Sequence, residues 1–248
     1  LIGEMSIGDM QEKGFRLSAD DIYQINRATI TDAVVSFGGF CTGELISAEG
    51  LLITNHHCGL GSIQDHSSLD NNYLDEGFWA MSREEELPNE RLSVTFLRYM
   101  EDVTAEMDEG LNGDMDPEEV REQIQKNMSS LIRNATEGNH YNAIVRPFYY
   151  GNAYYMFVYE VFNDVRLVGA PPEAIGNFGG DTDNWMWPRH TGDFSMFRVY
   201  TGPDGEPAEY SPENIPLKSK HFLPISLKGY EKGDFTMVLG YPGRTSRE

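Results

Sequence analysis

A β-hairpin that ends in a His-His-Cys motif is predicted by Cys41-Thr-Gly-Glu-Leu-Ile-Ser-Ala-Glu-Gly-Leu-Leu-Ile-Thr-Asn-His-His-Cys58. Two short runs rich in strand-forming residues flank the turn residues Ala48-Glu49-Gly50, as in an antiparallel connection. A histidine at the end of a strand is held by rigid backbone and faces a cleft, which suits a general base. The motif alone is also compatible with a structural histidine or with a metal ligand.

The rest of the chain reads mainly as short strands with one long helix. The helix is predicted over Asp116 to Arg133, because Asp116 is a good N-cap and Pro117 suits the first turn. A shorter helix is expected after Ser18, which has an acid three residues on. Further strands are predicted at Leu92–Met100, within Tyr141–Val168, at Asp193–Tyr200 and at Gly233–Gly240. This pattern favours a β-barrel with helical additions.

Composition limits the class of protein. The chain has 248 residues, 40% of them hydrophobic and 24% charged, which allows one large domain or two modest ones. It holds no apolar run long enough for a membrane span. The net charge of −21 argues against a nucleic acid partner, because such a surface repels phosphate. The main interpretation of this charge is that it keeps the protein soluble, and the alternative is that an anionic field attracts cationic groups such as the free amine of a peptide.

The chain contains two cysteines, Cys41 and Cys58. Such a pair is either one disulfide or two reduced thiols. Both residues belong to the same predicted hairpin, and a bond between them would fix the adjacent histidine. We therefore predict a Cys41–Cys58 disulfide.

A second notable segment is Asn177-Phe-Gly-Gly-Asp-Thr-Asp-Asn-Trp-Met-Trp-Pro-Arg-His-Thr-Gly-Asp193. Its aromatic and amide side chains are typical of a polar ligand pocket, although a loop whose tryptophans plug the barrel would look similar. Asp193 opens a predicted strand, so we expect its carboxylate to accept from the imidazole of His57, in preference to the rival acids Asp181 and Asp183. No Gly-x-Ser-Gly turn is present to supply a serine nucleophile, and Ser195 is interpreted as a barrel residue.

These segments resemble the chymotrypsin-like serine peptidases in local design, and resemble more closely the S46 family of bacterial dipeptidyl peptidases. The first likeness rests on a strand that leads to His-Cys, with a partner cysteine on the strand before it. The second rests on long runs that extend through most of the chain. These runs are Cys41–Ser47, Gly50–Gly59, Gly77–Asn89, Asn177–Asp193 and Gly233–Ser246.

The S46 resemblance implies roles for four residues. By that likeness His57 is the general base, Asp193 is the acid that orients it, and Asn184 with Trp185 holds the free amino terminus of the substrate. It also implies a periplasmic or secreted homodimer with no cofactor, whose signal peptide lies outside this chain. The family's nucleophilic serine and its large helical domain are expected beyond residue 248.

We therefore expect a mainly β fold. Residues 1–226 should form a chymotrypsin-like barrel with a helical insertion, and residues 227–248 should begin a second barrel. The expected function is the N-terminal part of a serine dipeptidyl peptidase that releases dipeptides from free N-termini and is inactive without the downstream serine. The alternatives are a non-catalytic module that binds peptide N-termini, and a metal-dependent hydrolase that uses His56 and His57.

Overall fold

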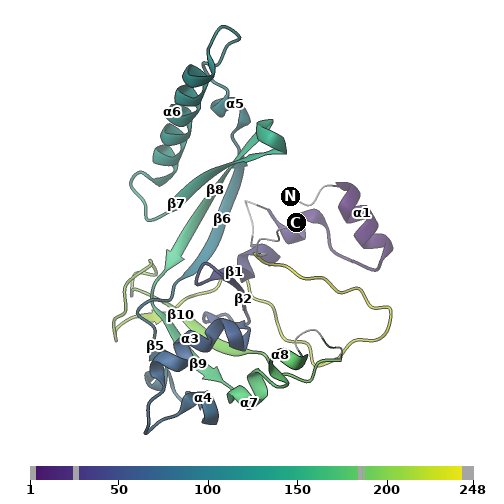
Figure 1. Cartoon of the computed structure of the whole chain (residues 1–248), viewed down its shortest axis with the longest axis vertical. Coiled ribbons are helices and arrows are strands. Elements are labelled where there is room, and N and C mark those ends of the chain that lie inside the picture. The colour runs from purple at the N-terminus through teal and green to yellow at the C-terminus, as the bar shows by residue number, and fades with distance from the viewer. Residues whose placement is uncertain (1–3, 25–27, 184–185, 187, 242–248) are drawn as a thin grey trace. The chain divides into compact units, whose positions relative to one another are not determined.

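The computed structural model describes residues 4–24, 28–183, 186 and 188–241, which form two compact units. Unit 1 comprises residues 1–95 and 162–248, and unit 2 comprises residues 96–161. Both units consist mainly of antiparallel strands with helical segments between them, so the predicted mainly β class is confirmed (Figure 1). Among the described residues, no helix has both the length and the hydropathy needed to cross a membrane.

The sheet of unit 1 is built around the predicted hairpin. Its strands follow the spatial order β4, β9, β10, β3, β2, β1, with β5 paired to β9 and β11 paired to β10. Their bounds are β1 Val34–Phe37, β2 Cys41–Leu45, β3 Leu51–Thr54, β4 Phe78–Trp79, β5 Leu87–Pro88, β9 Val165–Ala170, β10 Ser195–Thr201 and β11 Ile215–Pro216. The register pairs Glu44 with Ile53 in the hairpin, and Ser195 with Thr54 between β10 and β3.

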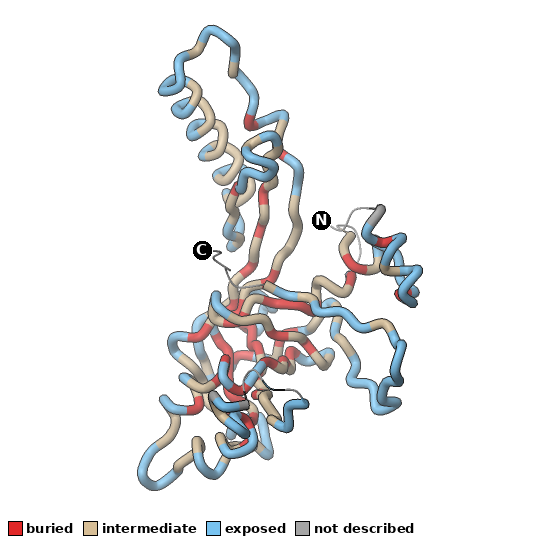
Figure 2. The backbone as a smooth tube through the Cα atoms, turned by 45° about the vertical axis from the view of Figure 1, so that its right-hand side comes forward, coloured by how far each residue is buried: buried red, intermediate tan, exposed pale blue. Residues whose placement is uncertain are grey.

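Alternating side chains of these strands form the core of unit 1. Leu45, Leu52 and Phe197 are fully buried, and the ring of Phe37 lies 4.8 Å from that of Phe197. Burying an aliphatic or aromatic side chain of this size stabilises a fold by about 1.5–3 kcal/mol. Figure 2 shows buried residues along the strands of this unit. The core therefore fixes β3 and β10, the two strands whose ends form the site described below.

Buried charge also holds β10 in place. Glu86, 6% exposed, accepts from Arg198 Nε at 2.9 Å and from the hydroxyl of Tyr200 at 2.7 Å. Burial, followed by the hydrogen bond to Glu86, raises the pKa of Tyr200 well above its usual range. The carboxylate thus has partners on one face of β10, which prevents the cost of an unpaired buried charge.

The helices of unit 1 are short, and α3 is the one that begins at the His-His-Cys motif. Its Gly59 lies so close to β10 that a Cβ there would be 3.0 Å from the Phe197 ring. The Ser18 cap precedes a helix as predicted, since Ser18 and Asp21 form a capping box. The helical segments are α1 Glu4–Glu12, α2 Ala19–Ile22, η1 Ile30–Ala33, α3 His56–His66, α4 Tyr73–Glu76, η2 Arg83–Glu85, α7 Glu173–Gly176 and α8 Gly180–Asp183.

Unit 2 is the helical insertion, in which one long helix packs on a three-stranded sheet. The strands lie in the order β6, β8, β7, and α6 begins at the predicted cap, where Asp116 accepts from two backbone N–H groups. Half-buried residues of α6, among them Ile124 and Leu131, pack against buried Val145 and Val158. The bounds are β6 Val94–Asp102, α5 Thr104–Met107, α6 Pro117–Thr136, β7 Asn142–Phe148, η3 Tyr149–Gly151 and β8 Ala153–Phe162.

The segment Gly233–Gly240, expected as a strand, has no strand structure. A strand needs a neighbouring backbone with which to exchange hydrogen bonds. In the part of the chain that the structure describes, its end instead contacts a side chain of β2, because the N–H of Tyr241 donates to Thr42 Oγ1 at 2.8 Å. The division into a first barrel at residues 1–226 and a second that begins at 227 stays an expectation.

Candidate active site

The site begins where β3 ends and α3 starts. Asn55 is the N-cap residue, and His56 and His57 are the first two residues of α3. Successive residues of a helix point about 100° apart, so the two imidazoles face different surroundings. His56 is 1% exposed, whereas the His57 side chain is 69% exposed. The accessible imidazole therefore belongs to His57.

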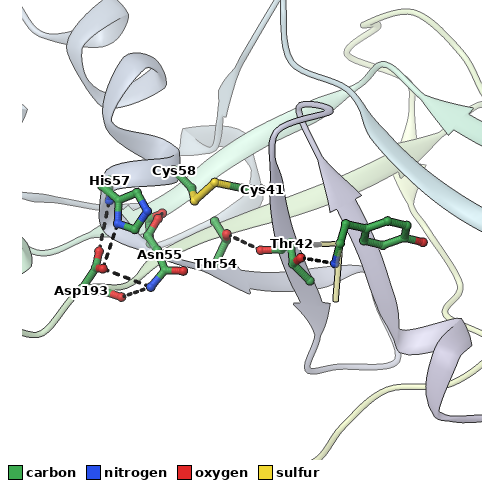
Figure 3. The surroundings of a disulfide bond; sticks show 9 residues. Cys41, Thr42, Thr54, Asn55, His57, Cys58 and Asp193 are labelled. Atoms are coloured by element: carbon green, nitrogen blue, oxygen red, sulfur yellow. Dashed lines mark hydrogen bonds and ion pairs between the residues drawn. A yellow bond between two sulfur atoms is a disulfide. The ribbon is translucent and has the colours of Figure 1, made fainter. Parts of the chain in front are cut away.

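The carboxylate of Asp193 binds His57 at two points (Figure 3). Oδ2 lies 2.9 Å from His57 Nδ1, and Oδ1 accepts from the His57 backbone N–H at 3.1 Å. A carboxylate can only accept, so Nδ1 carries the proton and Nε2 is left as the basic nitrogen. The predicted His57–Asp193 pairing is thus present, although the two residues are 136 positions apart.

Asn55 is a further member of the site that the sequence analysis missed. Its Nδ2 donates to Asp193 Oδ2 at 3.1 Å and to the Asp193 carbonyl at 3.3 Å. Asn55 makes no side-chain cap of its own helix, so the Asp193 carboxylate performs that role. Asp193 was expected to open a strand, but β10 begins at Ser195, so the carboxylate reaches the helix from the segment just before β10. The place of Asn55 directly before the His-His pair puts it near the site, but its contact with Asp193 follows only from the pairing of β3 with β10.

Strand pairing brings these residues together. Asp193 lies two residues before Ser195, which pairs with Thr54 at the end of β3. The hydroxyl of Ser195 is fully buried and donates to the carbonyl of Asn55 at 2.9 Å. Ser195 therefore ties β10 to the start of α3, which agrees with its interpretation as a barrel residue.

The predicted disulfide joins Cys41, the first residue of β2, to Cys58 in the first turn of α3. The Cα atoms are 6.2 Å apart, within the usual range for a cystine. His57 lies with these sulfurs in a group whose candidate ligand atoms are within 4.8 Å of one another. Both sulfurs belong to the disulfide, so neither is a thiolate that could bind a metal.

A cleft of about 620 Å³ opens beside His57 and Asp193. One wall is β2 with the end of β3, and another is the segment 238–241. Glu44 lines this cleft, and burial raises the pKa of its carboxyl above the ordinary 4.5. The acid–base pair thus faces a space large enough for a ligand.

The two ends of the segment between α7 and Asp193 are joined by hydrogen bonds, and the first of these ends contacts His56. A Cβ on Gly176 would lie 2.7 Å from His56 Nδ1, so the glycine lets α7 contact the imidazole ring. At the other end, Thr191 Oγ1 donates to the Gly176 carbonyl at 2.9 Å, and the Gly192 N–H donates to the Ile175 carbonyl at 2.9 Å. The predicted amine-binding residues, Asn184 and Trp185, fall within this segment and lie outside the described residues.

Relatives of this chain are peptidases. The sequence is 52% identical over 239 residues to a dipeptidyl-peptidase 7 of Capnocytophaga gingivalis. This alignment covers 96% of this chain and 33% of the relative. It is also 52% identical over 245 residues to an Asp/Glu-specific dipeptidyl-peptidase of Flavobacterium psychrophilum, over 99% of this chain and 34% of the relative.

Comparison with solved structures leads to the same group of proteins. The crystal structure of Porphyromonas endodontalis DPP11 in complex with the dipeptide Arg-Asp matches with a TM-score of 0.83 and 45% identity, over 93% of this chain and 34% of that chain. The sequence thus spans about a third of the length of the relatives it matches. The sequence model of the family Peptidase S46 matches residues 2–248. The chain therefore belongs to the peptidase S46 family.

Proposed function

We propose that this chain is the N-terminal part of a serine dipeptidyl peptidase, which releases dipeptides from the free N-termini of peptides. The proposal rests on one observation above all: the exposed His57 has its Nδ1 bonded to Asp193, and its Nε2 remains as a base. Relatives named as dipeptidyl peptidases support the substrate class.

In this proposal His57 transfers a proton in both halves of the reaction. In the first half, Nε2 takes the proton from the hydroxyl of a serine as its oxygen attacks the peptide carbonyl, and gives that proton to the departing amine, which leaves the dipeptide bound to the serine as an ester. In the second half, Nε2 takes a proton from a water that attacks this ester and returns it to the serine oxygen, which releases the dipeptide. Asp193 stabilises the imidazolium that forms between these steps. We place the nucleophilic serine in the remainder of the full-length protein, so residues 1–248 alone should not turn over.

The free amine of the substrate is assigned to Asn184 and Trp185. An amide carbonyl can accept from an ammonium group, and a tryptophan face adds a cation–π attraction of about 0.5–2 kcal/mol. A dipeptide-releasing enzyme must hold that amine two residues from the scissile bond. We further propose a homodimer located in the periplasm or outside the cell, an environment in which a disulfide persists.

The test uses the full-length protein that contains this chain, with a panel of unblocked dipeptidyl substrates and their N-acetylated versions. Wild type should cleave the unblocked substrates, and His57→Ala should lower kcat by roughly 10³-fold or more. His221→Ala, which changes a histidine outside the site, should retain activity. Equal cleavage of acetylated and unblocked peptides would exclude the amine-binding role, and full activity of His57→Ala would exclude the proposed base.

A further inference from the structure

The buried imidazole of His56 has no part in the reaction proposed above. The residue is 1% exposed, although its neighbour along the chain is the exposed base His57. Its Nε2 is buried and has no hydrogen-bond partner among the described residues. A buried polar atom without a partner lowers stability, so its presence in a native fold calls for an explanation. Within the described part of the chain, packing rather than hydrogen bonding therefore holds this ring in place.

The ring packs on Gly176, the last residue of α7. Gly176 is buried, and a Cβ there would overlap Cγ and Cδ2 of the imidazole and lie 2.7 Å from its Nδ1. Gly176 does not have a positive φ, so its backbone conformation would suit any residue. The contact with His56 is therefore the reason that this position needs a glycine.

The same glycine is connected to the acid–base pair. Its carbonyl accepts from Thr191 Oγ1 at 2.9 Å. Two residues further along the chain, the carboxylate of Asp193 binds His57 Nδ1 at 2.9 Å. His56 and His57 are consecutive residues of α3, so these contacts form a closed circuit that begins and ends on this helix. The circuit fixes both ends of the intervening segment relative to the base.

That segment, residues 177–190, contains Asn184 and Trp185, to which we assign the substrate amine. Only the described ends of the segment take part in the circuit. We infer that His56 is a positioning residue, whose ring sets the distance between the amine-binding segment and the base. An enzyme that releases dipeptides needs this distance to be fixed, because a displacement of about 1 Å can cost about 10²-fold in rate. The inference rests on the proposed function and concerns recognition of the free amine, not proton transfer.

A positioning residue and a packing residue differ in what their loss changes. Loss of packing alone lowers stability and affects all substrates alike. A displaced amine-binding segment instead weakens binding of the amine, while the His57–Asp193 pair can still activate the serine. A rise in KM that depends on the substrate amine, with the acid–base pair intact, is therefore specific to positioning.

The experiment uses the full-length enzyme and two substrates with the same chromogenic leaving group. One is an unblocked dipeptide, and the other is its des-amino analogue, in which hydrogen replaces the terminal ammonium group. His56→Ala and Gly176→Ala should each lower the unblocked-to-des-amino ratio of kcat/KM by about 10- to 100-fold, mainly through KM for the unblocked substrate. A fluorophosphonate, which requires the acid–base pair but carries no amine, should label the serine at the wild-type rate.

The double variant tests whether the two residues act through one contact. Once His56→Ala has removed the ring, a methyl group at position 176 no longer clashes and fills part of the vacated space. Adding Gly176→Ala to His56→Ala should therefore leave the ratio unchanged or raise it, whereas independent effects would multiply. Gly8→Ala is the control, since a Cβ at this position in α1 meets nothing within 4 Å, and it should leave all readouts unchanged.

Each outcome has one meaning. An unchanged ratio in His56→Ala would overturn the inference while the dipeptidyl peptidase proposal stands. Equal losses on both substrates, slower labelling, or failure of both single variants to fold would show that His56 acts through packing or through His57, and would also overturn it. Multiplied effects in the double variant would exclude the contact with Gly176 as the cause. If wild type does not prefer the unblocked substrate to its des-amino analogue, the amine-binding part of the proposed function itself fails.

Discussion

Replacing Asp193 with alanine should loosen the start of α3 as well as abolish the proposed catalysis. The side chain is 24% exposed, and it accepts from the backbone N–H of His57, from His57 Nδ1 and from Asn55 Nδ2. Loss of an acceptor at a helix N-terminus costs about 0.5–2 kcal/mol, and a hydrogen bond to a charged group contributes about 1.5–3 kcal/mol. We therefore expect the free energy needed to open the first turn of α3 to fall by about 1–3 kcal/mol.

Amide hydrogen exchange of the full-length protein measures this opening directly. Peptides that cover residues 55–66 should exchange roughly 5- to 150-fold faster in Asp193→Ala, since 1.4 kcal/mol corresponds to a factor of ten. Peptides from β9 in the same unit should exchange at the wild-type rate.

Asp193→Asn separates the two effects. Its amide oxygen can still accept from the His57 N–H, so the exchange rate of α3 should stay close to wild type. Its NH₂ group would donate to Nδ1, which places the imidazole proton on Nε2 and removes the base, at a cost of about 10⁴-fold in kcat. If exchange over residues 55–66 is the same in wild type and Asp193→Ala, the capping role of Asp193 is refuted.

Three other predictions concern stability, each measured by denaturant unfolding of the full-length protein. Cys58→Ser, made together with serine at the partner cysteine, should lower the free energy of unfolding of unit 1 by about 3 kcal/mol, and dithiothreitol should then have no further effect; an unchanged midpoint would contradict this. Gly59→Ala should cost about 1–3 kcal/mol because the new methyl group would press first on Ser195 Oγ, 2.5 Å away, and then on the Phe197 ring, whereas a neutral effect would show that α3 can shift. Glu44→Gln tests the raised pKa of this acid. The folded state binds the Glu44 proton more tightly than the unfolded state, so ionisation of Glu44 costs stability as the pH rises above 4.5. The variant should lose less stability than wild type between pH 4.5 and pH 7, and equal losses would contradict the assignment.

Local signals predicted much of the fold. Asp116 and Pro117 marked the start of α6, and the Gly-punctuated apolar runs marked β2 and β3, because capping and turn preferences depend on neighbouring residues only. The strand expected at Gly233–Gly240 was wrong for the opposite reason, since strand formation requires a distant partner that composition does not reveal.

The candidate site shows the same distinction between features that the sequence indicates and features that depend on distant contacts. The roles of His57 and Asp193 were expected from the family resemblance, and the structure brings the two side chains together. The contribution of Asn55 depends on the pairing of β3 with β10, and the contact of Gly176 with His56 depends on how α7 packs. Neither contact could be predicted from spacing, because each joins residues more than one hundred positions apart.

The closed base of the segment between Gly176 and Thr191 has a consequence for how this enzyme family can diversify. Its two ends are joined by backbone and hydroxyl hydrogen bonds directly above His56. The entropy of closing such a loop changes slowly with its length, so residues can be replaced, inserted or removed within it at small cost. The segment is therefore expected to tolerate changes of sequence and length. Under the proposed function, substitutions within this segment would change recognition of the substrate amine while the His57–Asp193 pair keeps its geometry.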